Sequence, residues 1–359
     1  MSGMWGNNLK LSIFGESHGN AIGITVDGLP TGFKICMDKV LDEMKRRAPG
    51  RSKLSTPRKE EDLPEILSGY FEGKTTGAPL CAIIRNSNTK SKDYSILKDV
   101  MRPGHADYTG NIKYNGFNDY RGGGHFSGRI TAPLVFAGAI CKQVLETKGI
   151  KVIAHVKSIG DIEDKSFLDI DITQDIEKLF KGKELPLIDS TKEDLIRGEI
   201  ENARKNQDSL GGTIECAILG IEPGIGNPFF NSIESTLAQL MFSIPAVKGI
   251  EFGKGFDIAK MKGSKANDEF YYDGDSVKTY TNNNGGVLGG ISNGMPIIFN
   301  TAIKPTSSIF REQNTVNIKT KENTTLKIEG RHDPCIVQRA IPVIEAVAAI
   351  GILELIGNK

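Results

Sequence analysis

Residues 336–357, IVQRAIPVIEAVAAIGILELIG, form the most apolar stretch of the chain and decide how the fold is organised. Arg339, Pro342, Glu345 and Glu354 interrupt the apolar run. A segment that spans a bilayer rarely carries charged residues, so these interruptions favour a buried helix over a transmembrane one. An apolar helix that stays within the protein has to be covered by other elements. We therefore predict a core helix here.

Outward from this helix, β-rich runs and helical segments alternate irregularly along the chain. The β-rich runs are bounded by Gly, Pro, Asn or Asp, and they lie at 9–14, 21–28, 78–85, 151–160, 211–220 and 295–303. Further helices are predicted at 37–48, 132–149, 231–244 and 190–207, the last with charges on most faces and therefore exposed. No repeat and no Pro- or Ser-rich linker divides the chain. We predict one α+β domain spanning 1–359, with the polar stretch 261–284 as a surface excursion.

Composition places the chain among soluble globular proteins and gives it no long-range electrostatic preference. Charged residues make up 25% and hydrophobic residues 38%, and the net charge is +1 at pH 7. This balance argues against nucleic acid or an anionic membrane as a partner. The five scattered cysteines include no C-x-x-C pair, which favours a reducing compartment over a disulfide framework. Since the N-terminus lacks a basic and apolar leader, we expect a cytoplasmic protein.

The pentapeptide GESHG at residues 15–19 fits G-x-S-x-G, the nucleophile elbow of serine esterases. An elbow requires a strand, a sharp turn at the serine and then a helix. Here the β-branched run 21–28 follows and predicts a second strand instead. The context disfavours a serine hydrolase that uses Ser17, and covalent labelling by a fluorophosphonate would decide the matter.

Several segments are suited to binding a small anion. Seven cations fall within KRRAPGRSKLSTPRK at 45–59, where arginine forks would match carboxylates or phosphates. The same run is open to interpretation as a solvated helix end, or as an RNA-binding segment, although it has no interleaved aromatic residues for base stacking. RGGGHFSGR at 121–129 lacks the glycine spacing of a dinucleotide fingerprint, but its backbone amides could bind an anion. KPTSSI at 304–309 is either a Pro turn or a phosphate cradle.

Four of the five histidines lie in loops rich in glycine or proline. They are His18, His105, His125 and His332. Each has a neighbouring Arg, Asp, Glu or Ser, and histidine titrates near neutral pH, so the pattern indicates an acid–base site. Because none shows the spacing of a metal motif such as H-E-x-x-H, we predict no metal.

Taken together and in order, these motifs resemble those of the chorismate synthase family. The matching segments are GESHG, RRAPGRSKLSTPRKEED, RPGHAD, YRGGGHFSGRITA, SIPAVKGIEFG, NNGGVLGGISNGMPI, KPTSSI and GRHDPCIVQRAIPVIEA. The resemblance implies a lyase that converts 5-enolpyruvylshikimate-3-phosphate to chorismate by 1,4-elimination of phosphate and a ring proton, the last step of the shikimate pathway. It also implies dependence on reduced FMN, a β-α-β sandwich of antiparallel sheets around helices, and a homotetramer. An external flavin reductase would supply the reduced FMN, with NADPH only as an indirect reductant.

The resemblance assigns roles to individual residues. It implies that His18 protonates the departing phosphate, that His105 protonates or polarises the flavin near N1, and that Asp333 with Ser17 relays the ring proton. For the substrate anions it points to Arg46, Arg47, Lys53, Arg102, Arg129 and Arg331, the last of which is also assigned to the flavin. For the flavin it points to His125, Phe126, Ser127, Ala246, Gly289, Lys304, Pro305, Thr306, Ser307, Ser308 and Arg331. Ala48 stands where many relatives carry a third arginine, so Arg46 and Arg47 are alternatives for one contact.

Overall fold

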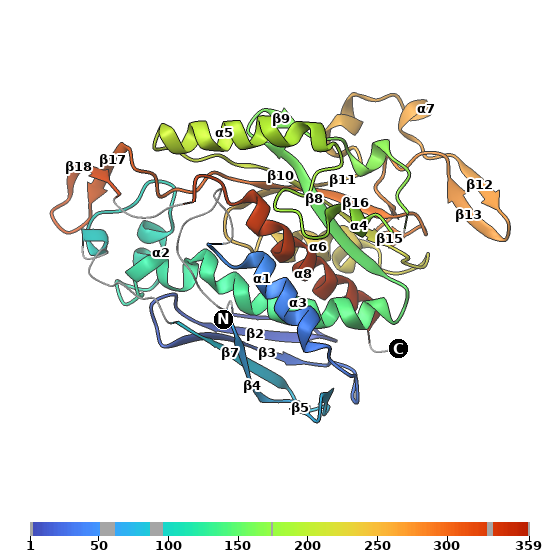
Figure 1. The fold of residues 1–359 in the computed structure, drawn as a ribbon, viewed down its shortest axis with the longest axis horizontal. Coiled ribbons are helices and arrows are strands. Elements are labelled where there is room, and N and C mark those ends of the chain that lie inside the picture. The colour runs from blue at the N-terminus through green and yellow to red at the C-terminus, as the bar shows by residue number, and fades with distance from the viewer. Residues whose placement is uncertain (1–2, 51–61, 87–95, 174, 329–332, 358–359) are drawn as a thin grey trace.

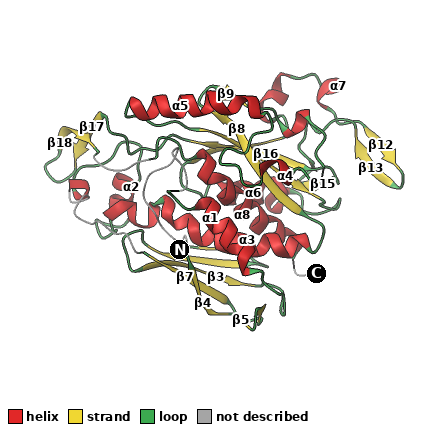
Figure 2. Cartoon of the chain, in the orientation of Figure 1, coloured by secondary structure: helices red, strands yellow, loops and turns green. Residues whose placement is uncertain are grey.

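The computed structural model describes residues 3–50, 62–86, 96–173, 175–328 and 333–357. Within these ranges, two antiparallel sheets enclose a layer of helices (Figures 1 and 2). The first sheet has the strand order β1 (Met4–Trp5), β2 (Lys10–Gly15), β3 (Ala21–Asp27), β7 (Leu80–Arg85) and β4 (Pro64–Ser68). The second has the order β11 (Val247–Phe252), β16 (Ile297–Ile303), β10 (Gly212–Leu219), β8 (Lys151–Ile159) and β9 (Ile162–Glu163). Strands β2, β3, β7, β8, β10 and β16 match the six predicted β-rich runs.

The helical layer consists of α1 (Met37–Arg47), α3 (Thr131–Glu146), α6 (Ile233–Met241) and α8 (Val337–Ile356). Helix α3 packs on β3 and β7 of the first sheet, and α8 packs on β8 and β10 of the second. The two helices also pack on each other, so together they join the sheets. The predicted α+β class, with antiparallel sheets around core helices, is confirmed.

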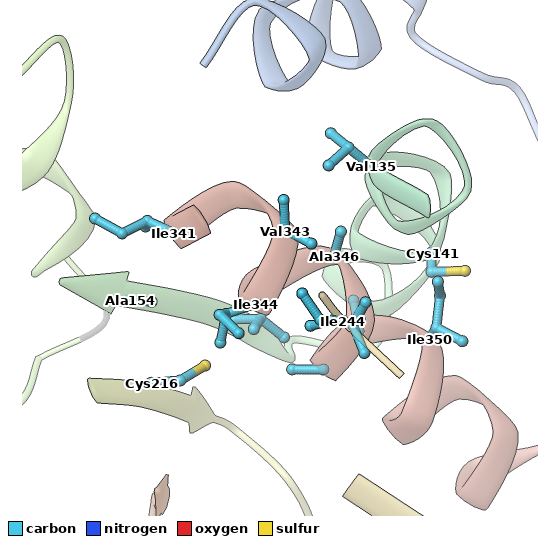
Figure 3. Close-up of a cluster of buried hydrophobic side chains, with 14 of the residues drawn as sticks. Val135, Cys141, Ala154, Cys216, Ile244, Ile341, Val343, Ile344, Ala346 and Ile350 are labelled. Atoms are coloured by element: carbon cyan, nitrogen blue, oxygen red, sulfur yellow. The ribbon is translucent and has the colours of Figure 1, made fainter. Parts of the chain in front are cut away.

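Helix α8 is the predicted core helix, and it is buried along almost its whole length. It lies so close to α3 that a Cβ added to Gly138 would overlap Ala346 (Figure 3). Its charged residues form hydrogen bonds with neighbouring segments. The Glu354 carboxylate accepts the backbone N–H groups of residues 7–9 at 2.6–2.9 Å. Among the residues that the structure describes, no helix has both the length and the apolar character needed to cross a membrane.

Shorter elements surround this sandwich. They are the hairpins β5–β6 (Tyr70–Phe71, Lys74–Thr75), β12–β13 (Phe270–Asp273, Ser276–Thr279), β14–β15 (Val287–Leu288, Ile291–Ser292) and β17–β18 (Glu312–Asn317, Glu322–Lys327), and the helices α2 (Asp107–Lys113), α4 (Glu177–Phe180), α5 (Glu193–Lys205) and α7 (Gly263–Ala266). The hairpin β12–β13 projects from the body at one side (Figure 1). The prediction that the helix within 190–207 is exposed was wrong for one face, because Ile196, Ile200 and Ala203 of α5 are buried.

The outer face of the second sheet carries a separate apolar cluster around Ile153 and Ala217. Because side chains alternate along a strand, His155 of β8 and Glu215 of β10 share this face, and they stand directly opposite each other in the ladder. Phe167 and Phe180, from the segment that follows β9, pack on the His155 ring with centroids 4.5 and 5.8 Å away. A histidine and a glutamate are therefore sealed under this segment, with His155 fully buried.

Candidate active site

GESHG connects two antiparallel strands and does not lead into a helix. Strand β2 ends at Gly15, β3 begins at Ala21, and Gly15 stands opposite Ile22 in the ladder. This is a β-turn context, and the strand–turn–helix context of a nucleophile elbow is absent from it. Both Ser17 and His18 are buried in the turn. Their Oγ and Nδ1 atoms are 3.1 Å apart.

The triple glycine at 122–124 lies against this turn. Ser17 donates its backbone N–H to the Gly124 carbonyl at 3.1 Å, and its hydroxyl lies 3.1 Å from the Gly122 carbonyl. The three glycines have φ angles of +57°, +85° and +53°, which favour residues without a side chain. A Cβ at Gly122 would overlap the ring of His18, and one at Gly123 would lie 3.0 Å from Nε2 of His105. The segment therefore runs as bare backbone between two imidazoles.

His105 belongs to a buried cluster with Arg102 and Asp107. The Asp107 carboxylate lies 2.6 Å from Nδ1 of His105 and accepts from Nε and Nη2 of Arg102 at 2.7 and 2.8 Å. Burial alone would raise the pKa of Asp107, but hydrogen bonds from Arg102 and His105 outweigh it and hold that pKa well below the ordinary value. Sequence reasoning missed Asp107, although an acid two residues after His105 in RPGHAD was a usable signal.

The loop 304–308 joins this cluster to Asp333. Lys304 donates its Nζ to the carbonyl of Gly104, and Arg102 Nη1 lies 3.4 Å from the Ser308 hydroxyl. The hydroxyl of Thr306 donates to the backbone carbonyl of Asp333 at 3.1 Å. RPGHAD, KPTSSI and Asp333 of GRHDPC, which are distant in sequence, therefore meet at one place.

Asp333 is linked in turn to the basic helix α1 through Arg339 at the start of α8. Arg339 pairs with the Asp333 carboxylate through Nη1 and donates Nε to the backbone carbonyl of Arg47 at 3.2 Å. Sequence reasoning assigned no role to Arg339. The structure places it between Asp333, a predicted relay residue, and Arg47, a predicted substrate-binding residue.

Arg47 and Arg129 share one buried carboxylate, that of Asp62. Arg47 Nη1 lies 2.6 Å from it, and Arg129 Nη1 also donates to it. Burial would raise the pKa of Asp62, but the two guanidinium groups outweigh it and lower that pKa. Arg129 also receives support at its backbone N–H, which donates to the Ser127 hydroxyl at 3.3 Å. Two predicted substrate-binding arginines are therefore brought together.

Arg46, one residue away, faces a different cluster within the helical layer. It donates to Glu345 of α8 at 2.6 Å and to Glu43 at 2.6 Å, and Lys142 of α3 contacts both carboxylates at 2.8 Å. Burial would raise the pKa of Glu345, but Arg46 and Lys142 outweigh it and lower that pKa to about 2. The geometry thus separates the two alternatives: Arg47 lies with Arg129, and Arg46 lies in a structural ion-pair network.

The residues predicted for the flavin lie at separate places in the described structure. His125 lies near the GESHG turn, where its Nδ1 donates to the Gly15 carbonyl at 2.8 Å, and Phe126 packs on Tyr114 with ring centroids 6.2 Å apart. Ala246 accepts the backbone N–H of Lys304 at 2.9 Å, beyond the C-terminal end of α6.

Gly289 stands apart from these residues. Its neighbour Gly290 accepts the N–H of Ile233 at the opposite end of α6, a helix about 13 Å long. Lys53 and Arg331 lie outside the described residues. Within the described ranges, no group of three His, Cys, Asp or Glu side chains is arranged to hold a metal ion.

Two imidazoles on either side of the glycine backbone, with Arg102 beside one of them, form an arrangement suited to acid–base chemistry on an anionic ligand. Comparison with known proteins identifies which enzyme family this is. The chain belongs to the chorismate synthase family, whose profile matches residues 9–356. The resemblance inferred from the motifs is thereby confirmed.

Full-length relatives and a solved structure agree with this assignment. The chain is 48% identical over 360 residues to the chorismate synthase of Methanocaldococcus jannaschii, covering 98% of this chain and 95% of that protein. It is 46% identical over 355 residues to that of Dehalococcoides mccartyi, covering 99% and 96%. A crystal structure of a chorismate synthase matches with a TM-score of 0.77 and 31% identity, covering 98% of this chain and 92% of that one.

Proposed function

We propose that the chain catalyses the 1,4-elimination of phosphate from 5-enolpyruvylshikimate-3-phosphate, a carbon–oxygen lyase reaction that yields chorismate and depends on reduced FMN. One observation carries the proposal: His18 and His105 flank the same glycine backbone, within a continuous set of contacts that includes Arg47, Arg102 and Arg129. The substrate carries one phosphate and two carboxylates, which suits several arginines in a chain of almost zero net charge.

In the proposed reaction, His18 protonates the phosphate as its C–O bond breaks. Negative charge develops on the leaving oxygen, so a positioned proton donor and nearby guanidinium groups stabilise the transition state. The Ser17 hydroxyl holds Nδ1 of His18 and fixes the orientation of the ring. Asp333, paired with Arg339, holds and passes on the ring proton together with Ser17.

The residues around His105 fit a reduced flavin. Gly123 lies beside the imidazole, and because a Cβ at this position would come within 3.0 Å of Nε2, the glycine leaves room at that edge of the ring. Lys304 and the hydroxyls of the 304–308 loop offer a cation and donors for the flavin phosphate. When bound, reduced FMN supplies electron density that stabilises electron deficiency during C–O cleavage.

The proposal extends to the protein's surroundings. It includes a homotetramer and a cytoplasmic location, and an external flavin reductase as the source of reduced FMN, with NADPH only as an indirect reductant. The net charge of +1 supports a role without nucleic acid or membrane partners.

An anaerobic assay with chemically reduced FMN tests the function. We expect chorismate and phosphate to form in equal amounts, and little product when oxidised FMN is supplied with NADPH alone. Absence of chorismate at saturating reduced FMN would contradict the proposal. Fluorophosphonate labelling of Ser17 would support a hydrolase instead, and salt-dependent RNA retention that survives His18→Ala would support a binding protein.

A further inference from the structure

We infer that Asp107 is a positioning residue that serves both ligands of the site, because its one carboxylate holds Arg102 for the substrate and His105 for the flavin. This inference rests on the proposed function and adds to it a residue that the motif resemblance did not assign. Asp107 is the first residue of α2, and it is buried together with Arg102. Gly104, with φ of +69°, turns the chain so that residues 102, 105 and 107 converge.

The first effect of Asp107 is on the His105 ring. Nδ1 lies 2.6 Å from Asp107 Oδ1 and 3.1 Å from Arg102 Nη2. A guanidinium nitrogen can only donate and a carboxylate oxygen can only accept, so the Nδ1 proton is donated to Asp107. Arg102 Nη2 lies close to His105 Nδ1 because both nitrogens donate to Asp107 Oδ1. The two nitrogens are not hydrogen-bonded to each other.

With Nδ1 so engaged, Nε2 is the ring nitrogen presented to the site. It faces Gly123, and in the described part of the chain it has no hydrogen-bond partner. It can therefore accept a proton from a ligand or, when protonated, donate one. Without the carboxylate, the ring could flip or adopt the other tautomer, and a bound flavin would meet a different atom.

The second effect is on the Arg102 guanidinium. Asp107 binds one edge of it through Nε and Nη2, and it also accepts the Arg102 backbone N–H at 3.1 Å. This bidentate arrangement fixes the plane of the guanidinium and directs Nη1 toward Ser308. The Nη1 edge is thus held ready for an anion of the substrate.

Because one carboxylate performs both tasks, its removal has to impair both ligands together. We expect Asp107→Asn to raise the KM for 5-enolpyruvylshikimate-3-phosphate and the Kd for FMN, each by about tenfold, and to lower kcat. FMN affinity is measured by quenching of flavin fluorescence. In an Arg102→Ala background the effect on KM should disappear, and in a His105→Ala background the effect on the FMN Kd should disappear.

Asp164→Asn provides a matched control, because Asp164 is also a buried aspartate beside a histidine, but on the far face of the second sheet. It should lower the free energy of unfolding and leave the KM and the FMN Kd unchanged. If Asp107→Asn does not fold, Asp107→Glu keeps the charge and should raise both constants, since its longer side chain displaces both partners.

Two outcomes would overturn the inference. One is wild-type KM and Kd in the folded Asp107 variant. The other is that its effects persist unchanged in the Arg102→Ala and His105→Ala backgrounds, as a general loss of structure would produce. Failure of the proposed function would look different: the wild-type protein would form no chorismate with reduced FMN, while the FMN-binding cycle would still report on Asp107 and His105.

Discussion

The described part of the chain contains two aspartate–histidine pairs. They differ in the group that contacts the second ring nitrogen of the histidine. In His155, Nδ1 lies 3.2 Å from Asp164 and Nε2 lies 2.9 Å from Glu215, so both nitrogens are closed by carboxylates. In His105, Nδ1 is held by Asp107, while Nε2 faces the backbone of Gly123. The same pairing therefore produces a structural link when carboxylates contact both nitrogens, and it suits the acid–base role that we propose for His105 when only one nitrogen is held.

His155 with Asp164 and Glu215, which we call the closed pair, holds the segment that follows β9 against the second sheet. Glu215 also accepts the Ser166 hydroxyl at 2.5 Å and the Phe167 backbone N–H at 2.6 Å. Asp164 accepts the backbone N–H groups of residues 188 and 189 at 2.6 and 2.9 Å. Burial would lower the pKa of His155, but the two carboxylates outweigh it and raise that pKa. Through these two carboxylates, His155 is linked to two parts of the segment at once.

The largest expected effect comes from removing one carboxylate of the closed pair. Glu215→Ala should lower the free energy of unfolding by about 3–5 kcal/mol, since it leaves a buried charge and buried donors without their acceptor. Urea unfolding measures the loss. The kcat/KM of the folded variant should stay at the wild-type value, because His155 lies on the face of the second sheet away from the helices. A loss below about 1 kcal/mol would show that the closed pair is not a structural link.

At His105 with Asp107, which we call the open pair, a substitution should lower kcat. His105→Ala should lower kcat by at least about 100-fold, the usual scale for a general acid–base group, and change the free energy of unfolding little. His18→Ala and Asp333→Ala should lower kcat on the same scale. The assay uses saturating reduced FMN under anaerobic conditions. Wild-type rates in all three variants would refute the site assignment.

The sequence was sufficient for the features that are local in the chain. The turn-bounded β-rich runs, the core helix α8 and the turn that holds His18 each carry their signal within about 20 residues. His155 shows why other features escape. It lies in a predicted strand, and its partner Glu215 is 60 residues away, so only the register of β8 against β10 brings them together.

Arg46 and Arg47 show a second limit of sequence reasoning. Adjacent helical residues point about 100° apart, so one reaches Glu345 in the helical layer and the other reaches Asp62. Which arginine faces which partner depends on the rotation of α1 in the assembled fold. The buried face of α5 is a different case, because Ile196, Ile200 and Ala203 recur at the helical spacing i, i+4, i+7, a local signal that the surrounding charges obscured.

The same comparison, between a structural ion pair and a pair in the candidate site, applies to Arg46 and Arg47 of α1. Arg47→Ala should raise the substrate KM by about tenfold, since Arg47 shares Asp62 with Arg129 in the candidate site. Arg46→Ala should instead lower the free energy of unfolding, because Glu345 loses a buried partner. Steady-state kinetics and urea unfolding of both variants measure the difference. A larger KM change in Arg46→Ala than in Arg47→Ala would reverse the assignment.

The smallest effect is the pH dependence of stability that the closed pair creates. A histidine whose pKa is raised on folding stabilises the fold fully below its unfolded pKa of about 6.5, and the contribution is lost as pH rises through the folded pKa. One such proton limits the slope to about 1.4 kcal/mol per pH unit. Urea unfolding from pH 6 to 10 should therefore show declining stability in the wild type and a shallower decline in His155→Gln. Parallel profiles for the two proteins would mean that folding does not raise the pKa of His155, and its ring would then donate to only one of the two carboxylates.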